Sequence, residues 1–300
     1  MEKAAKIWMD GKLIPWDKAK IHILTHTLHY GGGAFEGVRF YNTSNGPAIF
    51  RLKDHTNRLF YSAKTIGMKI PFSKAQINEA CKDIVSKNKL KEGYIRPLVY
   101  YGYGKMGLDP RQCVVNVSIA AWPWGAYLGD KPVTTKISKF MRIHPASTHS
   151  DAKLCGHYVN SILASLDVHN QGYGEAILLD YKGNIAEGPG ENIFFVKDGK
   201  LITPKLGSIL GGITRESIMQ IAKDNNIKVQ EKTVKPKELL AADEAFFTGT
   251  AAEVSPIAKI NDKKIGKKPI GPVTELLKTT FLKAVKGEEP RYKKWLTLAQ

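Results

Sequence analysis

The sequence predicts a mixed α+β protein made of two domains. The chain has 300 residues, enough for two ordinary domains. Segments of strand character and of helical character occur in both halves, but helices do not follow each strand regularly, which argues against a plain doubly wound sheet. Between the halves, residues 122–132 carry two prolines and two glycines without a long hydrophobic period. We therefore expect a smaller N-terminal domain over residues 1–121, an interdomain loop over 122–132 and a larger domain over 133–300.

The first domain is expected to open with a hairpin and then to mix strands and helices. Asp10-Gly11 tolerates the positive φ angles of a tight turn, so residues 6–15 are expected to form the hairpin. Leu59, Ala63 and Ile66 share one face of an expected helix. Ser73 and Gln76 form a capping box that opens a second helix. The expected strands are residues 34–41, 47–52, 94–101 and 112–121, and the expected helices are residues 54–66 and 73–88.

The second domain continues the same mixture. Apolar, β-branched runs indicate its strands, and amphipathic runs indicate its helices. Asp198-Gly199 indicates another tight turn. The expected strands are residues 133–137, 175–180, 192–196, 228–234 and 244–248, and the expected helices are residues 156–170, 214–225 and 272–286.

Composition excludes several classes of protein. Apolar residues make up 43% of the chain, enough for a real core, so disorder is excluded. The 45 basic residues exceed the 28 acidic ones, giving a formal net charge of +17. The basic residues are spread along the chain, and they show no alternation with aromatic residues and no nucleic-acid motif. We therefore expect no nucleic-acid partner, and the excess of lysine stays without an explanation.

The cysteines and the apolar runs bear on the compartment. The three cysteines, Cys81, Cys113 and Cys155, are far apart and form no C-x-x-C, so neither a disulfide framework nor a zinc site is indicated. The N-terminal residues lack the apolar core of a signal peptide. The longest uncharged stretch, residues 112–129, is too polar for a membrane helix. We expect a cytoplasmic protein without a membrane partner.

Common catalytic motifs are absent from the sequence. It contains no Walker loop, no G-x-G-x-x-G after a strand, no G-x-S-x-G and no H-E-x-x-H, and the eight histidines show no metal-ligand spacing. No metal site is expected. What stands out instead is a set of short glycine-rich loops, each with one unusual polar group. These loops are residues 29–39, 93–97, 151–158, 187–192, 210–215 and 248–253.

One of these loops resembles an anion site. Gly211 and Gly212 precede an expected helix, so the backbone N–H groups of Ile213 and Thr214 and the Thr214 hydroxyl would suit a phosphate. An ordinary capped helix explains the same residues, and taken alone they favour this plainer interpretation. Thr250, in the last loop, is a similar donor or simply part of a turn.

Lys153 and Glu187 are the two candidates for chemistry. Most lysines of so basic a chain are solvated, but Lys153 has small neighbours and a helix begins just after it. A desolvated lysine loses its proton readily and attacks aldehydes. Glu187 lies between Ala186 and Gly188, where a tight loop can present its carboxylate. A surface turn explains it equally.

Taken together and in this order, the loops resemble the branched-chain amino acid aminotransferases, which are fold-type IV pyridoxal phosphate enzymes. The resemblance covers the chain from Trp8 to about Pro272. It implies a two-domain architecture with a smaller α/β domain and a larger pseudo-barrel domain. The motifs that carry it are Tyr30-Gly-x-x-x-Phe35-Glu-Gly-x-Arg39, Tyr94-Ile-Arg-Pro97, Glu187-Gly-x-Gly-Glu-Asn192, Gly212-Ile-Thr-Arg215 and Gly249-Thr-Ala-Ala-Glu253.

The resemblance implies transfer of the amino group between leucine, isoleucine or valine and 2-oxoglutarate, by a ping-pong mechanism on pyridoxal 5′-phosphate. Lys153 would hold the cofactor covalently and move the proton during catalysis. Glu187 would face the ring nitrogen, and Tyr158 would bond the ring oxygen O3′. The implied phosphate contacts are Arg58, Ile213, Thr214 and Thr250. The implied ring contacts are Leu210 and Asn192.

For the substrates, the resemblance implies an apolar pocket that also accepts glutamate. Arg96 would bind the γ-carboxylate together with Tyr30 and Tyr127, and the N–H groups of Thr250 and Ala251 would bind the α-carboxylate. Tyr30 would come from a second subunit, so a homodimer or a hexamer of dimers is implied. Cys155 is expected to be a core residue. The expected pocket residues are Tyr30, Phe35, Gly37, Tyr94, Arg96, Met106, Trp124 and Tyr127.

Two alternatives stay open. A D-amino acid aminotransferase or an aminodeoxychorismate lyase shares the fold, although the motifs around Phe35 and Arg96 favour the branched-chain enzymes. A basic binding module without chemistry is the more distant alternative. The sequence does not rank leucine, isoleucine and valine.

Overall fold

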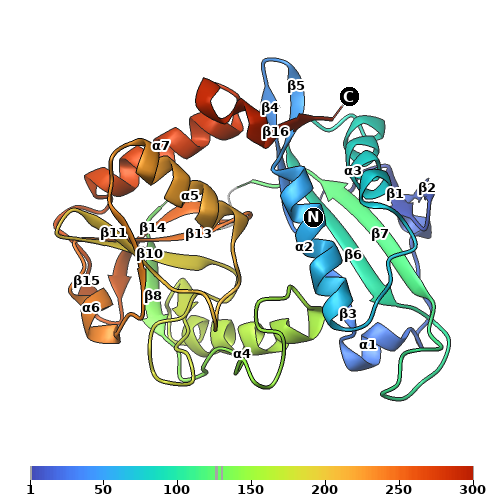
Figure 1. Cartoon of the computed structure of the whole chain (residues 1–300), viewed down its shortest axis with the longest axis horizontal. Coiled ribbons are helices and arrows are strands. Elements are labelled where there is room, and N and C mark those ends of the chain that lie inside the picture. Colours follow the sequence, from blue (N-terminus) through green and yellow to red (C-terminus); the bar gives the residue numbers. More distant parts are fainter. Residues whose placement is uncertain (1, 126–127, 130, 300) are drawn as a thin grey trace. The chain divides into compact units, whose positions relative to one another are not determined.

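The computed structural model describes residues 2–125, 128–129 and 131–299. The chain forms two compact units (Figure 1). Unit 1 comprises Met1–Gly125, Ala152–His157 and Ala284–Gln300, and unit 2 comprises Ala126–Asp151 and Tyr158–Lys283. Unit 1 therefore includes a short segment around Lys153 from the middle of the sequence. The domain boundaries expected at residues 121 and 133 stay a prediction.

Unit 1 is built on a sheet with the strand order β16-β5-β4-β6-β7-β1-β2, and β3 also pairs with β6. The predicted hairpin is confirmed, since β1 pairs antiparallel with β2 through Asp10 and Gly11, whose φ angles are +46° and +90°. The strands are β1 Lys6–Met9, β2 Lys12–Pro15, β3 Gly33–Phe35, β4 Val38–Thr43, β5 Gly46–Phe50, β6 Gly93–Tyr101, β7 Val115–Trp122 and β16 Leu296–Leu298.

Two helices cover one face of this sheet. Helices α2 (Leu52–Thr65) and α3 (Lys74–Lys87) pack against each other and against β6 and β7 (Figure 1). Their apolar faces, including Leu59 and Ile84, share one core with Ile95 of β6. Ala152 and Leu154 belong to the same core, so the residues on both sides of Lys153 are anchored by burial. The short helix α1 (His26–Tyr30) precedes β3.

Unit 2 contains the second sheet, in the order β12-β11-β10-β13-β14-β8-β9, with β15 paired to β14. Its parallel pairs β8–β9 and β11–β12 are each joined through a helix, α4 or α5. The strands are β8 Val133–Ile137, β9 Glu175–Ile177, β10 Asn192–Lys197, β11 Lys200–Pro204, β12 Val229–Lys232, β13 Glu244–Gly249, β14 Glu253–Ile260 and β15 Lys263–Lys264. The helices are α4 Tyr158–His169, α5 Ile213–Asp224, α6 Pro236–Leu240 and α7 Pro272–Val285. The predicted mixed α+β class is confirmed.

The strands expected over residues 34–41 and 47–52 differ from those observed. The strand expected over residues 34–41 is divided into β3 and β4, because Pro97 of the neighbouring strand β6 has no N–H and only accepts, from the Glu36 N–H at 2.9 Å. The strand expected over residues 47–52 stops at Phe50. Arg51 has a φ angle of +47°, which ends the extended chain, and α2 begins at Leu52.

The helix expected from residue 156 also begins later, at Tyr158. It follows a 3₁₀ turn, Cys155–His157, that carries the chain away from Lys153. In the described part of the chain, every helix is too short or too polar to span a membrane.

The capping box of α3 provides a test of local stability. The Ser73 hydroxyl accepts from the Gln76 N–H at 3.2 Å, and the Gln76 side chain accepts from the Ser73 N–H at 2.8 Å. We expect Ser73→Ala to lower the free energy of unfolding by about 1 kcal/mol, because the cap satisfies a helix N–H that would otherwise lack a partner. Urea unfolding measures this loss. Ser86→Ala, near the end of the same helix, is the control, and equal losses in both variants would contradict the role of the cap.

Candidate active site

Glu36 is a buried carboxylate at the junction of β3 and β4, and α2 supplies its partners. It accepts from Arg58 Nε at 2.6 Å, from Arg58 Nη2 at 2.9 Å and from His55 Nδ1 at 2.8 Å. Burial opposes ionisation of Glu36, but Arg58 and His55 outweigh it and hold the pKa of this carboxyl well below its ordinary value. Arg58 is therefore fixed as a cation against a permanent anion.

His55 is the second partner of Glu36 on α2. Burial lowers the pKa of its imidazole, and the nearby charges of Arg58 and Lys153 lower it further against the opposing effect of Glu36. Since Glu36 is the acceptor, Nδ1 carries the ring hydrogen. His55 and Arg58 lie one helical turn apart on α2, so both bond the Glu36 carboxylate from the same face of this helix.

Lys153 is held by its backbone between α2 and β3. Its N–H donates to the Ser62 hydroxyl at 2.9 Å, and its carbonyl accepts from the Phe35 N–H at 3.1 Å. Leu154 forms a β-bridge with Ala34. The Lys153 amine lies 5.0 Å from the centroid of the Phe35 ring. An amine on a backbone fixed at both ends has a defined position, as a covalent catalyst needs.

An aromatic cluster continues from Phe35. The Arg96 guanidinium lies 4.8 Å from the Phe35 ring centroid and 5.4 Å from that of Tyr94. Trp124 packs edge-on against Tyr94, with ring centroids 4.6 Å apart and an interplanar angle of 84°. The predicted pocket residues Phe35, Tyr94, Arg96 and Trp124 thus form a continuous series. It joins a cation to apolar ring surface.

Gly37 makes room for this cluster. A Cβ atom at this position would lie 1.7 Å from the Tyr94 hydroxyl oxygen and 2.6 Å from the ring carbon that bears it. Only glycine therefore allows the Tyr94 ring to occupy its observed place.

Glu187, in unit 2, lies in a second buried polar cluster. Its Oε1 accepts from Arg142 Nε at 2.6 Å, and its Oε2 accepts from Asn192 Nδ2 at 3.0 Å and from the Leu210 N–H at 3.1 Å. Only 5% of Glu187 is exposed. The carboxylate is a structured group of the core, so the surface-turn interpretation is wrong.

Asn192 connects this carboxylate to the start of α5. Besides Glu187, its Nδ2 donates to the Leu210 carbonyl at 2.9 Å. Its Oδ1 lies 1.9 Å from where a Cβ on Gly212 would stand, so glycine is required there. The cap position of α5 is Gly212, without a side-chain cap, and Thr214 lies in the first turn. The plainer interpretation of an ordinary capped helix is therefore wrong as far as a side-chain cap is concerned, and the helix N-terminus presents backbone amides.

The predicted residues divide between the units. Unit 1 holds the series from Lys153 to Trp124, together with Arg58 and Gly37, and unit 2 holds Glu187 with its neighbours. Tyr30 and Met106 are exposed, on α1 and on the loop after β6. Tyr127 lies outside the described residues. Tyr158 begins α4, and Thr250 and Ala251 follow β13. The predicted residues of unit 2 are Tyr158, Glu187, Asn192, Leu210, Ile213, Thr214, Thr250 and Ala251.

Several partners of these groups were not predicted. They include Glu36, His55 and Ser62 in unit 1 and Arg142 in unit 2. The spacing of His55, Arg58 and Ser62 at i, i+3 and i+7 on an otherwise apolar helix face is a signal that sequence reasoning could have used. Nothing local to Arg142 indicates its partner, which lies 45 residues away.

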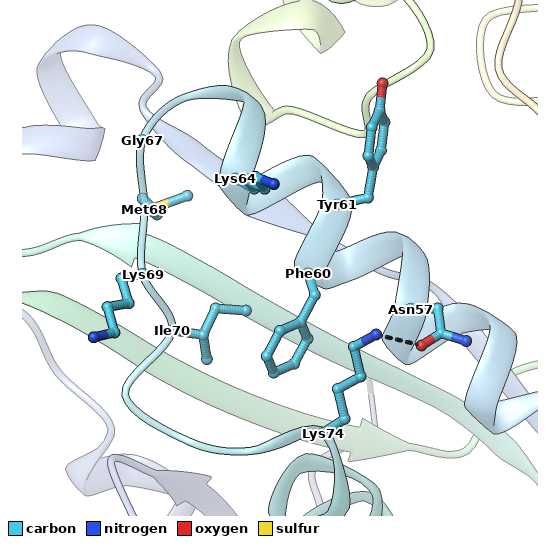
Figure 2. A pocket seen from close by; sticks show the side chains of 9 residues that line it. All are labelled: Asn57, Phe60, Tyr61, Lys64, Gly67, Met68, Lys69, Ile70 and Lys74. Atoms are coloured by element: carbon cyan, nitrogen blue, oxygen red, sulfur yellow. Dashed lines mark hydrogen bonds between the residues drawn. The ribbon is translucent and has the colours of Figure 1, made fainter.

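A separate hollow lies between α2 and the loop that leads to α3 (Figure 2). Its volume is about 660 Å³, and no residue of the predicted site lines it. Lys74 closes one side, donating to Asn57 Oδ1 at 2.8 Å and lying 5.7 Å from the Phe60 ring centroid. The lining residues are Asn57, Phe60, Tyr61, Lys64, Gly67, Met68, Lys69, Ile70 and Lys74. Among the described residues, no cluster of side chains suits a metal ion.

Comparison with known proteins identifies close relatives. The amino-transferase class IV family model matches residues 33–260. A branched-chain-amino-acid aminotransferase of Pseudomonas aeruginosa is 47% identical, covering 98% of this chain and 97% of its own. The corresponding Escherichia coli (strain K12) protein is 40% identical, with the same coverage.

Solved structures agree with the sequence relatives. A T.th. branched-chain amino acid aminotransferase complexed with N-(5′-phosphopyridoxyl)-L-glutamate superposes with a TM-score of 0.97 at 44% identity, and all of both chains is covered. The Escherichia coli branched-chain amino acid aminotransferase also has a TM-score of 0.97, at 39% identity, covering 99% of this chain and 100% of its own.

The Gly37 contact gives a direct test of the cluster geometry. We expect Gly37→Ala to lower the free energy of unfolding by about 1–3 kcal/mol, because the added methyl group must displace the Tyr94 ring from its packing against Trp124. Denaturant unfolding measures the loss. Gly125→Ala is the matched control, since a Cβ there has no atom of the described residues within 4 Å. Similar stability of the two variants would rule out the observed placement of Tyr94.

Proposed function

We propose a function on the premise that the chain belongs to the class IV aminotransferases and, within them, to the branched-chain-amino-acid aminotransferases. We infer that it exchanges the amino group of L-leucine, L-isoleucine or L-valine with 2-oxoglutarate, using pyridoxal 5′-phosphate. The two half-reactions would follow a ping-pong order, in which the first product leaves before the second substrate binds. Two structures of the T.th. relative support the dual specificity, one with N-(5′-phosphopyridoxyl)-L-glutamate and one with 4-methylvaleric acid, which has the carbon skeleton of leucine.

The chemistry of the donor groups fits the proposed cofactor. When bound, pyridoxal phosphate supplies an aldehyde and a ring that accepts the electrons released at the substrate Cα. The fit needs an amine, an acid for the ring nitrogen and donors for the phosphate. Lys153 is the amine, Glu187 is the acid, and the N-terminus of α5 and Arg58 are the anion donors. The buried Glu187 carboxylate, fixed by Arg142, is the observation that carries this proposal.

Each residue then has a stated role. We assign to Lys153 the covalent hold on the cofactor and the movement of the proton between the substrate Cα and C4′. Glu187 holds a proton on the ring nitrogen, which makes the ring a better electron acceptor. Tyr158 would bond O3′, and Leu210 and Asn192 would contact the ring. Arg58, Ile213, Thr214 and Thr250 would bind the phosphate.

The pocket residues serve the two kinds of side chain. Phe35, Tyr94 and Trp124 supply apolar surface for an aliphatic chain, with Gly37 leaving room for Tyr94. Arg96, within 5.4 Å of both the Phe35 and Tyr94 ring centroids, is the cation for the γ-carboxylate of glutamate. We also assign Tyr30, Met106 and Tyr127 to this pocket, and Thr250 and Ala251 to the α-carboxylate.

We further propose that the protein is a homodimer, or a hexamer of dimers. Val159, Ile162, Leu163 and Leu166 form an exposed apolar stripe on α4 at helical spacing. Ile23, Leu28 and Leu108 are exposed as well, and Leu108 reaches 86%. Apolar patches of this kind are typical of surfaces that a second subunit covers. A cytoplasmic location is also proposed, in keeping with the three free cysteines.

The absorption spectrum tests the chemistry. We expect the protein with pyridoxal phosphate to show a visible band that shifts when L-leucine is added, because the aldehyde form is converted to the amine form. Lys153→Ala should lose this band, and transamination should fall by about a thousandfold or more, since both the covalent hold and the proton transfer are lost. Lys64→Ala, an exposed lysine of the same unit, is the control. A band that persists in Lys153→Ala would refute the assignment.

The choice of substrate separates the related enzymes. We expect amino transfer from L-leucine to 2-oxoglutarate, measured as glutamate formed, and no transfer from D-alanine. The reverse preference would identify a D-amino acid aminotransferase. Release of an aromatic product from aminodeoxychorismate, without amino transfer, would identify the lyase.

A further inference from the structure

Arg39 is a buried cation for which the sequence indicates no role. It lies in β4, and only 6% of it is exposed. Its Nη2 donates to the carbonyl oxygen of Trp124 at 2.8 Å and to that of Gly125 at 2.5 Å. Burying a guanidinium is costly unless its N–H groups find acceptors. Arg39 and these two carbonyls therefore depend on each other.

Arg39 belongs to a row of side chains that crosses three strands. It is paired with Tyr94 of β6, and Tyr94 is paired with Trp122 of β7. Residues directly opposite each other in neighbouring strands point to the same face of a sheet, so these three side chains share a face. The rings of Tyr94 and Trp122 have centroids 5.4 Å apart.

The chain that leaves β7 turns back across this row. Strand β7 ends at Trp122, and the carbonyls of Trp124 and Gly125 reach Arg39, two strands away. On the way, the Trp124 ring meets Tyr94 edge-on at 4.6 Å and lies 5.9 Å from Trp122. Strand pairing holds the backbone up to Trp122, and the hydrogen bonds from Arg39 hold it at Trp124 and Gly125.

We propose that Arg39 is a positioning residue for the substrate pocket. By holding the backbone of Trp124 and Gly125, it keeps the Trp124 ring against Tyr94 and so forms the apolar wall that selects aliphatic side chains. This inference rests on the proposed function, in which Trp124 contacts the aliphatic substrate and Arg96 binds the γ-carboxylate of glutamate. Arg39 acts through Trp124, so its loss weakens recognition of leucine more than that of glutamate.

Steady-state kinetics of the holoenzyme test this proposal. The variants are Arg39→Met, Arg39→Lys, Trp124→Ala and the double variant Arg39→Met/Trp124→Ala. Arg111→Met is the control, because that side chain is 86% exposed. For each protein, kcat and KM are measured with L-leucine and with L-glutamate as the amino donor, and the visible spectrum of the cofactor is recorded.

We expect Arg39→Met to lower kcat/KM for L-leucine about 10- to 100-fold, mainly through KM, because one or two charge-assisted hydrogen bonds are lost. Arg39→Lys keeps the charge and should show a smaller loss in the same direction. The glutamate constants should change much less, and the cofactor spectrum should stay that of the wild type. Because Arg39 acts through Trp124, the double variant should be no worse than Trp124→Ala alone.

Three results would overturn the proposal: leucine constants of Arg39→Met that equal those of the wild type, equal losses for leucine and glutamate, or a double variant worse than Trp124→Ala. If Arg39→Met does not fold, Arg39→Lys carries the same comparison. If the wild-type protein lacks the cofactor band, the proposed function itself is contradicted. That outcome differs from a failure of the Arg39 inference, in which the band is present.

Discussion

The arrangement of unit 1 depends on the buried carboxylate of Glu36. An unpaired charge in this position would cost several kcal/mol, so α2 must bring Arg58 to it. That requirement fixes the rotation of α2 about its axis and its position along the sheet. Ser62, one turn beyond Arg58, then reaches the backbone of Lys153, whose carbonyl in turn binds Phe35, the residue before Glu36. The amine and the guanidinium of the site are thus placed by one closed circuit of hydrogen bonds.

Glycines allow the segment around Lys153 to lie close to the chain before β3. A Cβ on Gly31 would stand 2.9 Å from the Cα of Gly156, and Gly31 has a φ angle of +69° that disfavours other residues. A Cβ on Gly33 would stand 2.9 Å from the Cys155 sulfur. The glycine-rich loop over residues 29–39 therefore allows close packing against the segment around Lys153.

Local signals predicted local structure, and partners distant in the sequence were missed. The hairpin at Asp10-Gly11 and the capping box at Ser73 are determined within a few residues, and both are confirmed. The break in the strand at Glu36 depends on a proline far along the chain, Pro97, and β11 has no strong period of its own, so neither could be read from the sequence. Small neighbours and a following helix drew attention to Lys153, and a glycine beside it drew attention to Glu187. The ion pairs of Glu36 with Arg58 and of Glu187 with Arg142 join residues 22 and 45 positions apart, and only the folded chain reveals them.

The thiol of Cys155, two residues after Lys153, has a chemical consequence. Burial raises the pKa of Cys155 to about 11, and the same effect raises that of Cys81 to about 12. Since the thiolate is the reactive form of cysteine, almost none of either sulfur is nucleophilic at neutral pH. We therefore expect peroxide and alkylating agents to react slowly with the sulfur atoms of Cys155 and Cys81.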